Sequence, residues 1–185
     1  MPHQLEIEYD LTVVELLDAV SKRFRLKIAL EGAVAQVHLL RKIKALQGEG
    51  VIVSYEEHDI NGYPDFTIWH SKGNKPLLLE CKNVRDEDYR KRGVRVSYKV
   101  ETQKTRAAKS DPTSRFYDSN YFDILAVCLG KQTGNWNDFL FIKSGDLSRH
   151  AKHSEKLAVM HRVPLPAASN IAPWYQSLDK LLASL

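Results

Sequence analysis

Asp65, Glu80 and Lys82 have the residue types that catalysis on a charged substrate requires, and each lies at the end of a short apolar run. The two apolar runs are residues 66–69 and 77–79, and the polar segment between them is residues 71–76. β-Branched and aromatic residues favour strands, and a connection that contains glycine, asparagine and proline is typical of a β-hairpin. Antiparallel pairing places Asp65 beside Glu80, and side-chain alternation places Glu80 and Lys82 on one face, with Cys81 on the other. The sequence therefore predicts a carboxylate pair with one adjacent ammonium group.

Two carboxylates at this spacing suit a hard divalent cation such as Mg²⁺, which binds one or two protein carboxylates and otherwise water and phosphate oxygens. Such an ion acidifies a bound water and neutralises charge on a phosphate, while Lys82 orients the nucleophile or stabilises the transition state. Hydrolysis of a phosphodiester bond fits these parts. The competing interpretation is a β-hairpin with a solvated ion pair on its surface.

The order of these residues, Pro64-Asp65, fourteen intervening residues and then Glu80-x-Lys82, resembles the signature of the PD-(D/E)xK nuclease superfamily. That superfamily includes most type II restriction endonucleases and the archaeal Holliday-junction resolvases, and the resemblance covers roughly residues 31–129. It implies that Asp65, Glu80 and Lys82 are catalytic and that the metal is bound at Asp65, Glu80 and Cys81. The implied cofactor is Mg²⁺, for which Mn²⁺ substitutes.

A helix is predicted over residues 31–46, where apolar residues recur every third position before a glycine-containing breaker. At about 100° per residue, Gln36 lies in the middle of the apolar arc and points inward, whereas Glu31 lies nearly opposite. Superfamily members often carry a glutamate on this helix, directed at the metal site. Gln36 occupies that place and is assigned to the catalytic set, although an amide binds a metal more weakly than a carboxylate. Glu31 remains the alternative.

Positive charge is concentrated directly after Lys82. Residues 85–115 contain ten Lys or Arg and five Asp or Glu, an excess of five, whereas the whole chain has a net charge of +4. Residues 90–95 are predicted to form a loop that is either solvated or in contact with phosphates. A helix is predicted over residues 96–108, where superfamily nucleases often place a Gln or Lys near the scissile phosphate. Gln103 and Lys104 match that place, and Gln103 joins the catalytic set.

Residues 111–117 combine turn residues, a cation and two aromatic rings, a mixture that suits a nucleic-acid groove or a stacked base. The alternative is a loop held in place by its own aromatic side chains. The predicted DNA-binding residues are Lys104, Arg106, Arg115 and Tyr117. Lys104 and Arg106 are expected to contact the phosphate backbone, and Arg115 is expected to contact bases.

The remaining segments predict an α/β fold with a central mixed β-sheet flanked by helices, which the resemblance implies is a restriction-endonuclease-like sandwich. Residues 12–24 favour a helix with Thr12 as its N-cap, and the alternation in residues 5–10 favours a strand. The further predicted strands are residues 51–55, 122–129, 138–142 and 157–163, and the closing helix is residues 174–185. Residues 122–129 are almost continuously apolar, as in a strand buried on both faces.

The length of 185 residues and the hydrophobic content of 43% fit one domain over residues 1–185. Its core is expected over residues 31–163, with a C-terminal connector and helix over residues 164–185. Cys81 and Cys128 lie in apolar runs and are predicted to be buried thiols in a reducing cytosol. The chain has neither a signal-peptide pattern nor an apolar run approaching about 18 residues, so it is predicted to be cytoplasmic and not to enter a membrane.

The leading functional hypothesis is a Mg²⁺-dependent DNA endonuclease of the type II restriction-endonuclease-like kind. A structure-specific nuclease of repair or recombination, similar to a junction resolvase, is the alternative within the enzymes. A non-catalytic DNA-binding module on the same fold is the alternative outside them. A double-strand cut needs two active sites or two successive nicks, and a symmetric homodimer is one common answer.

Overall fold

The computed structural model describes residues 1–60, 62–104 and 109–185. These residues form two compact units, Met1–Val34 and Ala35–Leu185, which are described separately below. Helix α3, Phe24–Gly48, contains the boundary between the units, and its second half belongs to the larger unit.

The smaller unit consists of helices α1, Gln4–Tyr9, and α2, Val13–Ser21, and the first part of α3. Thr12 caps α2 in a reciprocal bond pattern with Glu15, as the sequence predicts. The strand predicted over residues 5–10 is wrong, because a second capping box between His3 and Glu6 starts a helix there. Helix α3 also begins seven residues earlier than the predicted Glu31. No described residue before Ala35 is buried.

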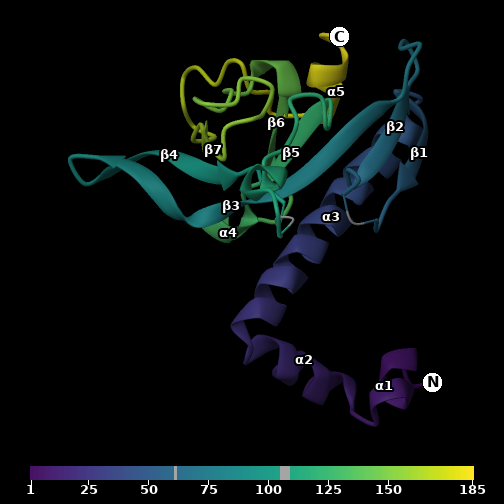
Figure 1. The fold of residues 1–185 in the computed structure, drawn as a ribbon. Helices are drawn as coiled ribbons and strands as arrows, with labels where there is room; N and C mark the ends of the chain where they lie inside the picture. The colour runs from purple at the N-terminus through teal and green to yellow at the C-terminus, as the bar shows by residue number, and fades with distance from the viewer. Residues whose placement is uncertain (61, 105–108) are drawn as a thin grey trace. The chain divides into compact units, whose positions relative to one another are not determined.

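The larger unit is built on a mixed seven-stranded sheet with helices, an α/β arrangement (Figure 1). Its strands are β1 Ile52–Glu57, β2 Phe66–His70, β3 Leu77–Lys91, β4 Val94–Glu101, β5 Ile124–Cys128, β6 Phe139–Lys143 and β7 Met160–Val163. The main path runs β1-β2-β3-β4-β7, and β5 pairs with β3 and β6. The β3–β5 pair is parallel and every other pair is antiparallel. The short helices are α4 Gly130–Thr133, α5 Leu178–Leu182, η1 Pro112–Arg115 and η2 Ser144–Asp146.

Hydrophobic cores lie on both faces of the sheet. Strand β5 alternates between them: Ile124, Ala126 and Cys128 join one core, and Leu125 and Val127 join the other. This confirms the predicted strand that is buried on both faces. The first core is covered by the second half of α3, whose Leu39 and Ile43 are fully buried, and by α5. Both cysteines are free and buried.

Two predicted elements around the basic segment differ from the structure. The predicted helix over residues 96–108 is wrong as far as residues 96–101, which belong to β4 between β3 and β7. The predicted loop over residues 90–95 is confined to the two-residue turn Arg92-Gly93, where both residues have positive φ, 51° and 80°, and the residues on either side belong to β3 and β4. The closing helix is confined to α5, and β7 begins three residues later than predicted.

None of the described helices is long and apolar enough to cross a lipid bilayer.

Candidate functional site

The β2–β3 hairpin brings the two predicted carboxylates together. The strands pair antiparallel with Phe66 opposite Leu79, so Asp65 lies opposite Glu80. Asp65 Oδ2 accepts a 2.7 Å hydrogen bond from the backbone N–H of Cys81, which fixes the carboxylate against the neighbouring strand. The predicted hairpin, its register and its connection over residues 71–76 are confirmed.

Glu80 and Lys82 project from the same face of β3 and form an ion pair. Lys82 Nζ lies 2.6 Å from Glu80 Oε1, and Glu80 is only 3% exposed. The hydroxyl of Tyr117 donates a 2.6 Å hydrogen bond to the same oxygen. The Lys82 ammonium also lies 5.5 Å from the centre of the Tyr117 ring. The carboxylate of the pair is therefore buried and the Lys82 side chain is 27% exposed, unlike the solvated surface ion pair of the competing interpretation.

Gln36 contacts the site from helix α3. Its Nε2 donates a 2.7 Å hydrogen bond to Asp65 Oδ1, so the inward direction predicted from the helical period is confirmed. Asp65 thus accepts hydrogen bonds at both oxygens, and both donors are neutral. The rival residue, Glu31, belongs to the smaller unit.

Burial and mutual repulsion shift the ionisation of the site. Burial and the charge of Glu80 raise the pKa of Asp65 to about 6. Burial opposes the charged form of Lys82, but the adjacent Glu80 carboxylate prevails and raises the pKa of this ammonium. Burial, with help from Glu80, also raises the pKa of Tyr117. At neutral pH the site holds a protonated lysine, a protonated phenol and a carboxylate that is costly to ionise.

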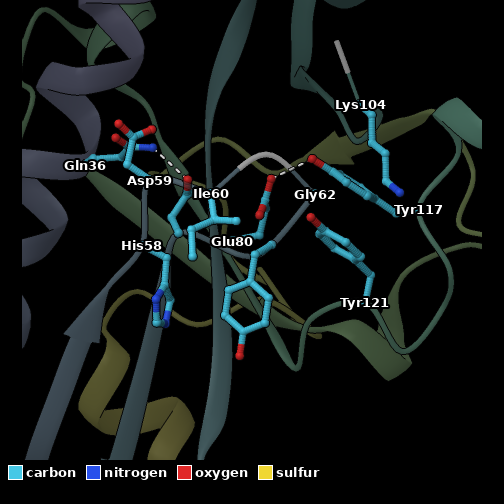
Figure 2. A pocket seen from close by; sticks show the side chains of 11 residues that line it. Gln36, His58, Asp59, Ile60, Gly62, Glu80, Lys104, Tyr117 and Tyr121 are labelled. Carbon is cyan, nitrogen blue, oxygen red and sulfur yellow. Dashed lines mark hydrogen bonds between the residues drawn. The ribbon is translucent and has the colours of Figure 1, made fainter. Parts of the chain in front are cut away.

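Asp65, Glu80 and Tyr117 line a cavity of about 460 Å³, whereas Lys82 is not among the residues that line it (Figure 2). Figure 2 shows Gln36 and Tyr117 approaching it from opposite sides, with Glu80 between them. The residues that line the cavity are Gln36, His58, Asp59, Ile60, Gly62, Tyr63, Asp65, Glu80, Lys104, Tyr117 and Tyr121. The opening is large enough for a phosphate group with several water molecules.

The wall of the cavity opposite Gln36 is aromatic and cationic. Tyr121 stacks on Tyr117 with ring centres 4.5 Å apart, and Lys104 Nζ lies 5.3 Å from the centre of the Tyr121 ring. Desolvation raises the pKa of Tyr121 to about 12. Sequence reasoning missed Tyr121, and its only signal was an aromatic residue just before the buried strand β5. Asp59 also lines the cavity.

The structure separates the two residues predicted to follow the catalytic strand on a helix. Lys104 lines the cavity. Gln103 is not among the residues that line it; it forms a β-bridge with Phe116 and its amide donates to Glu101. The assignment of Gln103 to the catalytic set therefore has no support from its position, because residues 100–103 continue in an extended conformation instead of turning into a helix.

Three further predicted contact residues have different surroundings from those expected. Tyr117 is 4% exposed and bonded to Glu80, so its ring is not available to stack on a base. Arg115 Nε donates to the backbone carbonyl of Lys104, 3.2 Å away, and Phe116 stacks on His150 with ring centres 4.6 Å apart. These contacts favour the alternative of a loop held by its own side chains. Arg106 lies outside the described residues.

The donor set fits a divalent cation at two carboxylates. Asp65 and Glu80 face one polar cavity, and their repulsion is not relieved at Asp65 by any hydrogen-bonded cation in the described residues. Cys81 contributes its backbone to the site, but its thiol lies in the core on the other face, where burial raises its pKa. Within residues 1–60, 62–104 and 109–185 there is no cluster of three or more His, Cys, Asp or Glu that could hold a metal.

Comparisons with known proteins are sparse. The chain matches no protein-family model, and it matches none of the curated proteins. Among solved structures it is similar to a bacterial homing endonuclease, I-Ssp6803I, with 16% sequence identity and a TM-score of 0.47. The similarity covers 78% of this chain and 83% of the endonuclease chain.

Proposed function

We propose that this protein is a metal-dependent endonuclease that hydrolyses phosphodiester bonds of DNA at the cavity lined by Asp65 and Glu80, with Lys82 paired to Glu80 beside it. The observation that carries the proposal is the pairing of two adjacent carboxylates, one with a pKa raised to about 6, beside a lysine held in its charged form. Without a bound cation, the repulsion between the two carboxylates destabilises their ionised form. Such destabilisation is expected at an active site that binds a metal. The fold that accompanies it is proposed to be a restriction-endonuclease-like variant of the α/β class.

Asp65 and Glu80 are the proposed ligands of Mg²⁺, with Mn²⁺ as a substitute. Both donors to Glu80 reach Oε1, so among the described contacts Oε2 is the oxygen left for a cation. When bound, the cation supplies charge neutralisation at the scissile phosphate and a water of lowered pKa. Gln36 and the backbone amide of Cys81 orient the Asp65 carboxylate by donating hydrogen bonds to it. In metalloproteins, hydrogen bonds of this kind orient the side chains that bind the metal.

Lys82 acts as a fixed positive charge. Because its pKa is raised, it does not accept a proton from water at neutral pH. It lies on the face of β3 that carries Glu80, so it can donate to the attacking water or to a phosphate oxygen. Lys104, on the wall opposite Gln36, adds a second positive charge against the phosphate.

A homodimer belongs to the same proposal, since a double-strand cut requires two active sites or two successive nicks. The smaller unit supports it. The exposed fractions of Ile7, Val14 and Phe24 are 71%, 70% and 75%, and neither α1 nor α2 has a buried residue. Exposed apolar surfaces of this kind mark sites of protein–protein interaction. A second copy of the chain would cover this surface and would also supply the second active site. Light scattering coupled to gel filtration is expected to give twice the chain mass, and Val14→Glu to lower it.

The test of the function is nicking of supercoiled plasmid. We expect nicking with Mg²⁺ or Mn²⁺, none with EDTA, and a loss of at least about 100-fold in Asp65→Asn and in Lys82→Ala. Circular dichroism checks that each variant folds. Robust nicking by both folded variants would rule out this site, and DNA binding without any cleavage would favour a non-catalytic binding module. Discrete linear fragments would indicate a restriction-like enzyme, and cleavage restricted to four-way junctions a resolvase-like one.

A further inference from the structure

The strand that carries Glu80 and Lys82 continues well beyond the cavity. β3 runs for a further nine residues from Lys82 to Lys91, turns at Arg92-Gly93 and returns as β4. Figure 1 shows this hairpin extending away from the other strands. We call residues 86–96 the arm. No residue of the arm is buried, and Val94 and Val96 are 67% and 41% exposed. The arm therefore contributes nothing to either hydrophobic core.

The tip of the arm carries a surplus of positive charge. Residues 88–95 contain four cations, Arg90, Lys91, Arg92 and Arg95, against the single carboxylate of Asp88. Asp88 accepts from Arg90 at 2.8 Å and from Arg95 at 2.6 Å, so it ties the two strands together at the tip. Lys91 and Arg92 are exposed and form no ion pair within the described residues.

A second group of cations lies where the arm joins the sheet. The ring of Tyr89 has Lys99 Nζ 4.8 Å from its centre and the Arg162 guanidinium 4.3 Å from it. Lys99 and Arg162 are partners in the β4–β7 register. Neither forms a salt bridge with a carboxylate in the part of the chain that the structure describes. Cations therefore lie both at the tip and at the β4–β7 junction, and the carboxylates between them, Asp86 and Glu87, pair with Lys131 and Arg85.

We infer that the arm binds the phosphates of duplex DNA along the wide groove, to one side of the bond that is cut. The inference rests on the proposed nuclease function. A two-stranded ribbon fits the major groove, which is about 12 Å wide, and is too broad for a minor groove of about 6 Å. Nine residues at about 3.3 Å each give the strand a reach of at most about 30 Å from Lys82. That distance corresponds to about nine base pairs at about 3.4 Å per step.

The sequence alone does not lead to this arm, because residues 90–95 were expected to be a loop and residues 96–108 a helix. The structure instead joins the arm to the proposed active site through one strand, β3, whose pairing with β4 is irregular between Val84 and Asp88 and between Tyr89 and Arg90. Contacts at the tip therefore set the direction of the DNA duplex relative to Glu80 and Lys82.

The experiment compares two doubly substituted proteins with the parent. Lys91→Gln with Arg92→Asn removes two charges from the tip, and Asn tolerates the positive φ at residue 92. The matched control, Lys72→Gln with Lys75→Gln, removes two exposed charges from the connection at the opposite end of β3. Affinity for a 40-base-pair duplex and for a single strand of equal length is measured in EDTA at several salt concentrations.

We expect the tip variant to bind the duplex several-fold more weakly and to lose about two units from the slope of log K against log salt, since each phosphate contact contributes about 0.9. The control and the single strand should show little change. Equal slopes in all three proteins, or an equal loss on single strands, would overturn the inference. Plasmid nicking at saturating protein is measured in parallel. Absence of nicking in the parent protein would instead refute the proposed function, whatever the binding slopes.

Discussion

The hydroxyl of Tyr117 and the ammonium of Lys82 both lie 2.6 Å from Oε1 of Glu80. Tyr117 reaches the carboxylate through its phenol. It is therefore a positioning residue. We expect Tyr117→Phe to lower the free energy of unfolding by about 2 kcal/mol, the worth of a hydrogen bond to a charged group. The Mg²⁺ concentration for half-maximal nicking should rise about tenfold, the effect typical of removing a residue that hydrogen-bonds to a metal ligand.

The neighbouring ring supplies the control for this prediction. Tyr121 stacks on Tyr117 in the same cavity wall, and its hydroxyl forms no hydrogen bond within the described residues. Tyr121→Phe should leave both the stability and the Mg²⁺ dependence near those of the parent. Equal effects in the two variants would assign the Tyr117 phenotype to general disturbance of the wall. Urea unfolding and a Mg²⁺ titration of nicking measure the two quantities.

Asp65 predicts how the metal-free protein responds to pH. Its pKa is raised to about 6 in the fold from 3.8, so the folded state binds the proton more tightly than the unfolded state. The resulting stabilisation is fully present below about pH 4 and is lost as pH rises through about 6. Between pH 5 and pH 8 in EDTA, Asp65 should lower the free energy of unfolding by about 1.4 kcal/mol. Urea unfolding at both pH values measures this difference.

Asp65→Asn isolates this contribution from those of other titrating groups. The variant should show a pH-dependent loss smaller than the parent's by about 1.4 kcal/mol, and it should be the more stable protein at pH 8. Adding Mg²⁺ at pH 8 should stabilise the parent and not the variant. A parallel pH dependence in the two proteins would show that Asp65 ionises normally.

The charges at the site predict opposite effects on DNA binding without metal. Asp65 and Glu80 repel a phosphate, whereas Lys82 attracts it. In EDTA, Asp65→Asn should therefore bind DNA more tightly and Lys82→Ala more weakly, each by a few-fold. Glu80→Gln should gain less than Asp65→Asn, because the Glu80 charge is already balanced by Lys82. Fluorescence anisotropy with a labelled duplex gives the three affinities, and weaker binding in all three variants would contradict the electrostatic account.

A substitution at Gln36 tests the effect of a neutral residue at the place where PD-(D/E)xK nucleases often carry a glutamate. Gln36→Glu puts a third carboxylate next to Asp65 Oδ1, at the position of a 2.7 Å hydrogen bond. We expect tighter Mg²⁺ binding and, in EDTA at pH 8, a loss of stability of about 1–3 kcal/mol from the unpaired, half-buried charge. Gln36→Met is the control, because it removes the hydrogen bond without adding charge. Isothermal titration with Mg²⁺ separates the two variants, and a weaker affinity in Gln36→Glu would exclude Gln36 from the metal surroundings.

The site strand and its partner could be predicted because the relevant signals are local. The turn residues between β2 and β3 fix the hairpin, and the pleat alone then places Glu80 and Lys82 on one face. The apolar run of β5 likewise needs no partner to be recognised as buried on both faces. The direction of Gln36 follows from the helical period of α3.

Two of the errors lie where distant partners decide the structure. Residues 94–101 contain polar and charged residues that also suit a helix, but pairing with β3 and β7 makes them a strand. Tyr117 lies in a segment rich in turn residues, and only the folded chain shows that its ring enters the core beside Phe122. In residues 5–10 the alternation of apolar and acidic residues is overridden by the capping box between His3 and Glu6, which is also a local signal.

Because Glu80, Lys82 and one side of the arm belong to the single 15-residue strand β3, the length of this strand sets the distance from the proposed active site to the tip of the arm. Two extra residues in each side of the arm would lengthen it by about 7 Å while every side chain kept its face. One extra residue would instead move every side chain beyond it to the other face of the ribbon. The footprint on DNA can therefore vary in steps of about two base pairs between proteins of this design, with no change to the geometry around Asp65 and Glu80.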